Sequence, residues 1–221
     1  MASREELREQ KEKTSQALIQ SALELCAEEG YASLSLRSVA RKAGIAPTSF
    51  YRHFREIDEL GVAMVDQAKE LLEDCLEQAR EKMKFPAVKQ KNAALSLFKS
   101  IDGIARPFAD TFFECFRKNS QLLHLFFQEQ TGSSKTMRVA ISAAMDQLNG
   151  TLENTLKRLT KTSGYGFGDT GLIAEAMMTI VSHSGLEMTM FQDDDPVDIA
   201  ERAIQKMNLL LLGALMKDMP V

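Results

Sequence analysis

The segment GIAPTSFYRHF (residues 44–54) concentrates side chains that donate hydrogen bonds. Its polar members are Thr48, Ser49, Tyr51, Arg52 and His53. No acidic residue occurs between Gly30 and Arg55, and the cations of this stretch are Arg37, Arg41, Lys42, Arg52 and Arg55. Because a solvated helix face normally mixes acids with its cations, this composition predicts contact with a polyanion.

The rest of the chain has the opposite charge. Residues 56–221 carry 18 Lys and Arg residues against 24 Asp and Glu residues, in a chain of net charge −4. The summed field of an acidic protein repels a polyanion, so the cations of residues 30–55 imply a local binding surface.

Size and composition are those of a globular protein. The 221 residues, 44% hydrophobic and 26% charged, can build a real core without disulfides or metal. Cys26, Cys75 and Cys115 form no C-x-x-C pair and are predicted to be core side chains. No run approaches the roughly 20 apolar residues of a membrane span, and residues 1–13 lack a signal-peptide core. We therefore expect a cytoplasmic protein with no membrane partner.

Apolar residues recur at helical spacing along the chain, and runs of alternating β-branched residues are absent. The predicted fold class is all-α, with about nine or ten helices. We expect a first helix that ends at Gly30, with Gly103 and Pro107 marking a later break. The further helices are predicted at residues 35–43, 47–54, 58–84, 87–103, 107–118, 120–130, 134–160, 171–190 and 196–217.

Two of these helices, 35–43 and 47–54, are short and are joined by a three-residue turn that begins with Gly44. Phe50 and Phe54 are four residues apart, so both must face inward, which leaves the polar side chains outward. This is the spacing of a helix-turn-helix, in which the second helix enters the major groove of duplex DNA.

The outward side chains suit such a groove. Arg52 can bind guanine bidentately, whereas Thr48 and Ser49 can contact base edges or thymine methyl groups. Tyr51 and His53 can donate to the phosphate oxygens that fix the register. The predicted partner is therefore duplex DNA.

The segment SLSLRSVARKAGIAPTSFYRHFREIDEL (residues 33–60) closely resembles the DNA-binding segment of TetR-family bacterial repressors. That family's pattern runs roughly T-x-R-x-I-A-x-x-A-G-V-S-x-x-x-x-Y-x-H-F-x-x-K-E-x-L. The resemblance implies a three-helix DNA-binding head, residues 1–57, and a larger helical ligand-binding and dimerisation domain, residues 58–221. It implies a DNA-binding surface formed by Ser35, Arg37, Thr48, Ser49, Tyr51, Arg52, His53 and Arg55. Where many members have a phosphate-binding lysine this chain has Ile57, and Arg55 can replace that contact.

A narrower resemblance rests on the run GIAPTSFYRHFR and on E-x-T-G-S-S at residues 129–134. These are similar to the FabR/DesT branch, repressors of unsaturated fatty acid synthesis that respond to acyl-CoA or acyl-carrier thioesters. The resemblance implies a repressor of fatty acid biosynthesis or desaturation genes with a long-chain acyl-CoA effector and no cofactor. The turn at 129–134, followed by Lys135 and Arg138, either receives carrier phosphates or is an ordinary helix connection.

Aromatic and sulfur side chains concentrate in the second predicted domain. Eight of the twelve phenylalanines lie between Phe85 and Phe127, and nine of the twelve methionines between Met137 and Met219. They supply either an ordinary core or a site for a hydrophobic effector between helices. The candidate ligand-binding residues are Phe112, Phe113, Phe116, Phe126, Phe127, Met145, Met177 and Val181.

The last two predicted helices, 171–190 and 196–217, are unusually apolar, and residues 209–216 are apolar nearly all round. We expect these helices to pair in a homodimer. A dimer would place the two groove-binding helices about 34–36 Å apart, or a multiple of this distance, on an inverted-repeat operator.

Two alternatives stay open. A TetR-type repressor of an efflux pump that senses hydrophobic drugs would use a buried acid, for which Glu114 is the candidate. For an acyl-binding carrier or scaffold without DNA function, the behaviour of the protein mixed with duplex DNA would not depend on salt concentration. An enzyme is not expected, because no catalytic Ser/His/acid grouping, metal-ligand spacing or phosphate loop occurs; G-x-G-x-G at 164–168 lacks a preceding strand.

Overall fold

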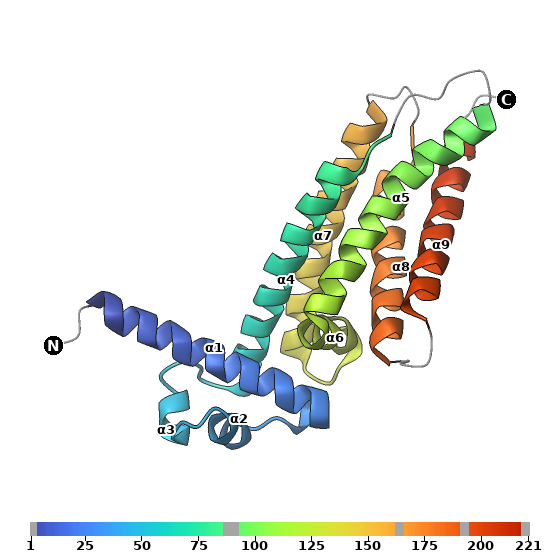
Figure 1. Ribbon diagram of the computed structural model, residues 1–221. Coiled ribbons are helices and arrows are strands. Elements are labelled where there is room, and N and C mark those ends of the chain that lie inside the picture. The colour runs from blue at the N-terminus through green and yellow to red at the C-terminus, as the bar shows by residue number, and fades with distance from the viewer. Residues whose placement is uncertain (1–3, 86–92, 162–165, 191–194, 218–221) are drawn as a thin grey trace. The chain divides into compact units, whose positions relative to one another are not determined.

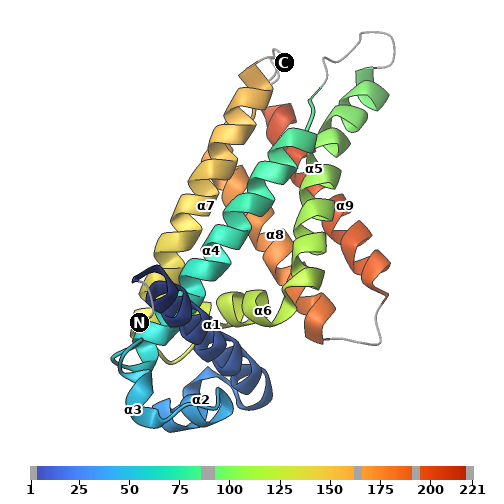
Figure 2. The same ribbon diagram turned by 60° about the vertical axis from the view of Figure 1, so that its left-hand side comes forward.

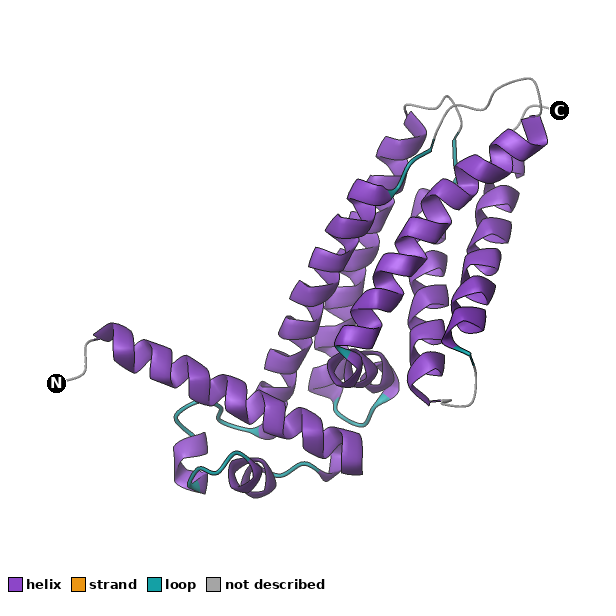
Figure 3. Cartoon of the chain, viewed as in Figure 1, coloured by secondary structure: helices purple, strands orange, loops and turns teal. Residues whose placement is uncertain are grey.

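The computed structural model describes residues 4–85, 93–161, 166–190 and 195–217, and every regular element among them is a helix (Figures 1 and 3). This confirms the all-α prediction for these residues. None of the helices in these ranges is long and apolar enough to cross a membrane. In chain order the elements are α1 (Arg4–Glu29), η1 (Tyr31–Ser33), α2 (Leu36–Lys42), α3 (Pro47–Phe50), α4 (Ile57–Lys82), α5 (Ala93–Lys118), α6 (Ser120–Gln128), η2 (Glu129–Thr131), α7 (Lys135–Lys161), α8 (Thr170–Met190) and α9 (Pro196–Lys217).

The chain divides into two compact units. Unit 1 comprises residues 1–69 and 121–144, and unit 2 comprises residues 70–120 and 145–221. Helices α4 and α7 thus contribute residues to both units. The functional domains predicted from the sequence, 1–57 and 58–221, stay a prediction.

In unit 1, helix α2 packs against both α1 and α3 (Figure 1). The side chains of Leu18, Ala22, Val39 and Phe50 are completely buried and supply the core of these three helices. Because α3 is a single turn, it gains too few hydrogen bonds to form alone, and its stability comes from this packing.

In unit 2, helix α5 packs against α8 and α9, and α8 packs against α9 (Figure 2). Phe108, Phe112 and Phe116 follow one another along a single face of α5, with ring centroids 6.0 and 5.6 Å apart. All three are at most 1% exposed, so they form an aromatic row within the core.

The predicted break between helices 87–103 and 107–118 is wrong, because α5 continues through Pro107. A proline lacks the N–H that would bind the carbonyl four residues earlier, which here is the carbonyl of Gly103. The backbone N–H of Lys84 donates to this carbonyl instead, at 2.9 Å. A tertiary hydrogen bond thus replaces the lost helical one.

Glycine packing in unit 2 gives a stability prediction. A Cβ at Gly185 of α8 would fall well inside contact distance of the Phe116 ring, which is 1% exposed and would have to shift. We expect Gly185→Ala to lower the free energy of unfolding by about 1–3 kcal/mol, as overpacking does.

Gly150→Ala in α7 is the matched control, since a Cβ there meets no atom within 4 Å. It should raise the free energy of unfolding by about 0.5–1 kcal/mol, because alanine favours helix over glycine. Urea unfolding of both variants measures the difference, and equal effects at the two positions would contradict the packing argument.

Candidate nucleic-acid interface

The turn between α2 and α3 is fixed by backbone hydrogen bonds. Gly44 has a φ of 70°, which a side chain rarely tolerates. Its N–H donates to the carbonyl of Arg41 at 3.2 Å, and the N–H of Ile45 donates to the carbonyl of Ala40 at 3.0 Å. This pair of bonds ends α2 in the manner of a glycine-terminated helix and sets the direction in which α3 begins.

The start of α2 is fixed by two serines. Ser35 Oγ accepts from the N–H of Ser38 at 3.1 Å, and Ser38 Oγ accepts from the N–H of Ser35 at 3.0 Å. The hydroxyl of Ser35, a predicted DNA-binding residue, therefore caps its own helix.

Helix α3 is shorter than the predicted 47–54, since it ends at Phe50. Beyond it the chain follows tight turns, in which the N–H of His53 donates to the carbonyl of Phe50 at 2.8 Å. The N–H of Phe54 donates to the same carbonyl at 3.1 Å, so Phe54 keeps a helix-like position below Phe50. The i, i+4 relation between the two rings survives although the regular helix stops.

The two phenylalanines anchor the segment. Phe50 is 0% and Phe54 6% exposed, and their ring centroids lie 5.8 Å apart. Tyr51, by contrast, is 61% exposed, and Arg52 is also exposed. We call the exposed side chains of Thr48, Tyr51 and Arg52 the α3 surface.

The other predicted DNA-binding residues differ in exposure. Arg37 and Arg55 are exposed, whereas Ser49 and His53 are half-buried. No ion pair among the described residues involves Arg37, Arg52 or Arg55. These guanidinium groups remain available to an external anion.

Lys42 departs from the expected basic surface. Its Nζ lies 3.2 Å from Glu24 Oε2 and 3.6 Å from Glu28 Oε1, both on α1. Two acids that are distant in sequence thus neutralise one of the cations of residues 30–55. A hydrogen bond to Glu24 and the charge of Glu28 raise the pKa of Lys42.

His53 occupies a positively charged environment. Burial, and then the charges of Lys11 and Arg52, lower the pKa of its imidazole. Its Nδ1 is buried without a hydrogen-bond partner among the described residues. Lys11 of α1 is an exposed cation beside this site that the sequence analysis missed. Lys11 lies two helical turns before the buried Leu18 and so on the same face of α1. This spacing could have identified it from the sequence.

Ile57, at the position of the family's lysine, is half-buried at the start of α4. The Tyr31 hydroxyl lies 3.3 Å from its carbonyl oxygen and 3.0 Å from Asp58 Oδ1. The Ser134 hydroxyl donates to the same Asp58 oxygen at 3.0 Å. The start of α4 is therefore held by bonds within unit 1.

The polar groups of the turn at residues 129–134 are hydrogen-bonded to residues at the start of α7. Arg138 Nη1 donates to the carbonyls of Gly132 and Ser133 at 2.6 and 3.0 Å. Ser134 Oγ accepts from the N–H of Met137 at 3.2 Å and so caps α7. Burial raises the pKa of Glu129, whose carboxylate packs against Gly132. These contacts are those of a structural helix connection.

The candidate ligand-binding residues fall in both units. Phe112, Phe113, Phe116, Met177 and Val181 are buried in unit 2, where Met145 is half-buried. Phe126 and Phe127, in α6, are buried in unit 1. Phe116 lines a cavity of about 260 Å³ together with Met188 and Thr189.

Glu114 is not the buried acid that a sensor of cationic drugs requires. Its side chain is 50% exposed, and Lys118 Nζ lies 2.7 Å from its Oε1. The hydrogen bond and charge of Lys118 lower the pKa of this carboxyl. Across the described ranges, no three His, Cys, Asp or Glu side chains gather in a metal-binding arrangement.

Comparisons with known proteins agree with this geometry. Residues 18–64 match the family model described as bacterial regulatory proteins, tetR family. FadR from Bacillus subtilis, solved in complex with stearoyl-CoA, is similar in structure, with 16% identity over 87% of this chain and 96% of that chain and a TM-score of 0.67.

Two further solved structures are similar. The fatty acid degradation regulator FadR from Bacillus halodurans is 19% identical over 91% of this chain and 96% of that chain, with a TM-score of 0.64. PfmR, a TetR family transcriptional regulator from Thermus thermophilus, is 19% identical over 88% of this chain and 97% of that chain, with a TM-score of 0.60. At these identities the likeness shows the fold.

The environment of His53 gives a pH prediction. Because its pKa is lowered in the folded protein, the unfolded chain binds more protons as the pH falls. Its contribution to stability is therefore present above the ordinary histidine pKa and is lost as the pH falls through the lowered folded value. Histidine-ring NMR should place the His53 pKa below that of an exposed histidine.

Lys11→Gln should raise the His53 pKa by removing a neighbouring charge. Lys13→Gln, which removes a cation on the same helix that pairs with Glu9, is the control and should move it less. Titration of His53 above the ordinary value would contradict the described environment.

Proposed function

We propose, on the premise that residues 18–64 belong to the tetR family of bacterial regulatory proteins, that the chain is a homodimeric transcriptional repressor. Regulators of this family are DNA-binding proteins and not enzymes. The observation that carries the proposal is the α3 surface, which presents Tyr51 and Arg52 to solvent above the buried Phe50 ring. In this proposal α3 enters the major groove of an inverted-repeat operator, and the protein acts in the cytoplasm.

The contacts divide by chemistry. Arg52 and Thr48 read base edges, because a guanidinium fork fits the acceptors of guanine and a threonine can contact either edge atoms or a thymine methyl. Tyr51, Arg37 and Arg55 bind phosphates and fix the register. Lys11 of α1 adds a further cation to this set, and the loss of Lys42 to its ion pairs removes one.

Exposed apolar side chains support a dimer through α8 and α9. Leu209 of α9 is 71% exposed and Leu172 of α8 is 61% exposed. Leu209 and Leu212 also line a hollow of about 270 Å³ with Phe98, which is 52% exposed. A neighbouring copy that covers these side chains would remove apolar surface from water.

The effector in this proposal is a long-chain acyl-CoA or acyl-carrier thioester, and the regulated genes serve unsaturated fatty acid synthesis, as in the FabR/DesT branch. Support comes from the fold shared with a fatty acid degradation regulator and with a protein solved with stearoyl-CoA. The apolar interior of unit 2, with Phe112, Phe116 and Met177, offers a lining for the chain. Ligand pockets have volumes of roughly 300–1,000 Å³, and in this proposal the acyl chain occupies such a space among these side chains.

Helix α4 can couple the two events. It is one continuous helix of which residues 57–69 belong to unit 1 and residues 70–82 to unit 2. A ligand that displaces its second half therefore also acts on the part that unit 1 holds through Tyr31 and Asp58. A coupling of about 1–3 kcal/mol is typical, and it must be reciprocal between DNA and ligand.

Selection of bound duplexes from a random pool should yield an inverted repeat. Against this operator, Arg52→Ala should lose roughly 1–3 kcal/mol of base discrimination at one position of each half-site. Fluorescence anisotropy with single-base operator variants measures this loss. Arg158→Ala, which removes an exposed cation in α7, is the matched control and should keep the discrimination.

The salt dependence of the same binding tests the carrier alternative. Each phosphate contact should contribute about −0.9 to the slope of log K against log salt. A slope of zero, or equal effects of the two arginine variants, would contradict DNA reading by α3.

Acyl-CoA titration tests the effector. If the acyl chain supplies the binding energy, each added CH₂ contributes about 0.8 kcal/mol, and affinity should rise about fourfold per methylene over a series of saturated chains. Operator affinity should then change roughly 5–150-fold at saturation. Free CoA is the control, and binding that is independent of chain length would contradict an acyl-chain sensor.

A further inference from the structure

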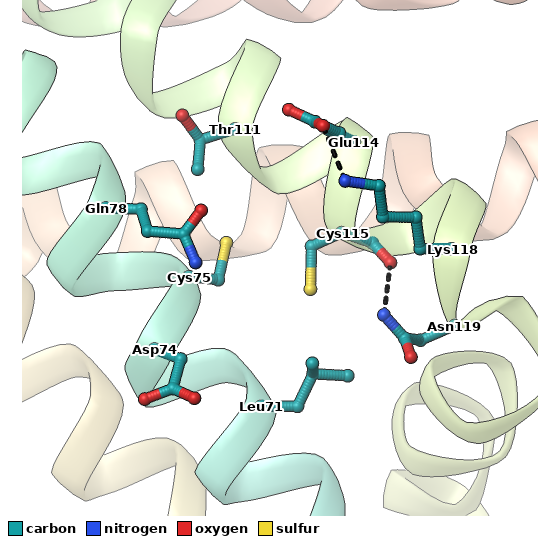
Figure 4. Close-up of a pocket in the computed structure, with 9 residues that line it drawn as sticks. All are labelled: Leu71, Asp74, Cys75, Gln78, Thr111, Glu114, Cys115, Lys118 and Asn119. Carbon is teal, nitrogen blue, oxygen red and sulfur yellow. Dashed lines mark hydrogen bonds and ion pairs between the residues drawn. The ribbon is translucent and has the colours of Figure 1, made fainter.

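Two cysteines from different helices line one cavity in unit 2. The cavity has a volume of about 140 Å³ and lies between α4, which contributes Cys75, and the C-terminal part of α5, which contributes Cys115 (Figure 4). A water molecule occupies about 30 Å³ in the liquid, so the space admits a small polar molecule such as a peroxide.

The two thiols differ in character. Cys75 is buried and Cys115 is half-buried. The interaction between the two thiols, which line the same cavity, raises the pKa of Cys75 and lowers that of Cys115. The charge of Lys118 also lowers the pKa of Cys115, against the opposing effects of burial, Asp74 and Glu114. Cys115 is thus the better nucleophile and Cys75 its protonated neighbour.

The surroundings of Cys115 hold it in place. Asn119 Nδ2 donates to the carbonyl oxygen of Cys115 at 3.1 Å, as Figure 4 shows. Thr111, one turn earlier on α5, accepts from Lys82 Nζ at 3.2 Å. Lys118 and the Thr111 hydroxyl supply donors around a cavity that is otherwise lined in part by the sulfurs. Such donors can stabilise the oxygen that leaves when a thiolate attacks a peroxide.

We propose that Cys75 and Cys115 are a peroxide-sensitive dithiol site, in which oxidation forms a disulfide between α4 and α5. The oxidant is hydrogen peroxide or an organic hydroperoxide. This adds a second input to the chain, independent of an apolar effector.

The reaction has two balanced steps. The Cys115 thiolate attacks one peroxide oxygen, the O–O bond breaks, and the leaving oxygen takes up a proton, which gives Cys115 sulfenic acid and water, or an alcohol from an organic hydroperoxide. The thiolate formed when Cys75 loses its proton then attacks the Cys115 sulfur. The S–O bond breaks, hydroxide leaves with a proton as water, and two electrons have passed from the thiols to the peroxide.

The disulfide would restrict the spacing of the helices. A disulfide needs Cα atoms within about 7 Å of each other, so oxidation fixes α4 at Cys75 to α5 at Cys115. That this constraint alters operator affinity rests on the proposed function, whereas the thiol chemistry does not.

The test uses the reduced full-length chain, treated with hydrogen peroxide at equimolar dose and then alkylated under denaturing conditions. Intact mass and peptide mapping should show the loss of two hydrogen atoms and a Cys75–Cys115 cross-link. Cys75→Ser should stop at a Cys115 sulfenic acid that a dimedone probe captures, and Cys115→Ser should leave Cys75 reduced.

Cys26→Ser is the matched control and should oxidise like the unmodified protein. Cys26 lies in unit 1, where burial and the charge of Glu129 raise its pKa to about 12. The proposal is overturned if both thiols survive, if Cys115 proceeds to sulfinic acid without the cross-link, or if Cys26 reacts as fast as Cys115.

Operator binding of the reduced and cross-linked forms is measured separately. A severalfold change supports the regulatory consequence, and equal affinities overturn that consequence alone. If neither form binds DNA, the proposed function fails while the mass data still decide the dithiol site.

Discussion

Burial of the Phe50 and Phe54 rings is the interaction on which the α3 surface depends. Full burial of a phenylalanine contributes about 1.5–3 kcal/mol, whereas a single helical turn gains almost nothing from its own hydrogen bonds. The rings therefore position the backbone of α3 and of the turns that follow it. With both rings facing inward, Tyr51 and Arg52 face solvent, and no further interaction is needed to orient them.

The electrostatics of unit 1 follow from this placement. Arg52, an exposed guanidinium group without an ion pair among the described residues, and Lys11 lie near His53, whose pKa is lowered by burial and by these two cations. The chain as a whole is acidic, so this concentration of positive charge is maintained against the net field. One lysine of the region is already paired with α1, so the cations open to an external anion are a subset of those in the sequence.

Much of the fold was predictable because it follows from the spacing of apolar residues within each helix and from the residues at helix ends. Phe50 and Phe54 at i, i+4, Gly44 at the start of a turn and Ser35 at a helix start each act within a few residues, and the structure has them as expected. Apolar residue type also predicted burial for Phe112 and Met177.

The features that sequence reasoning missed depend on distant residues. The pairing of Lys42 with Glu24, the proximity of Lys11 to His53 and the exposure of Glu114 require knowledge of which helices pack together. The location of Phe126 in unit 1 is of the same kind, because hydrophobicity predicts burial and not the unit in which it occurs.

Pro107 lies within α5, and its missing N–H leaves the Gly103 carbonyl free to bind Lys84, which follows α4. Most other residues at this position would restore an amide to compete with Lys84 for the Gly103 carbonyl, and any side chain at Gly103 would collide with the Lys84 carbonyl oxygen. The path of the chain after α4 is therefore set by three backbone groups. These are the N–H of Lys84, the Gly103 carbonyl that accepts from it, and the backbone nitrogen of Pro107, which carries no competing hydrogen. A residue that favours helix more strongly would improve α5 taken alone and loosen its hold on the preceding segment.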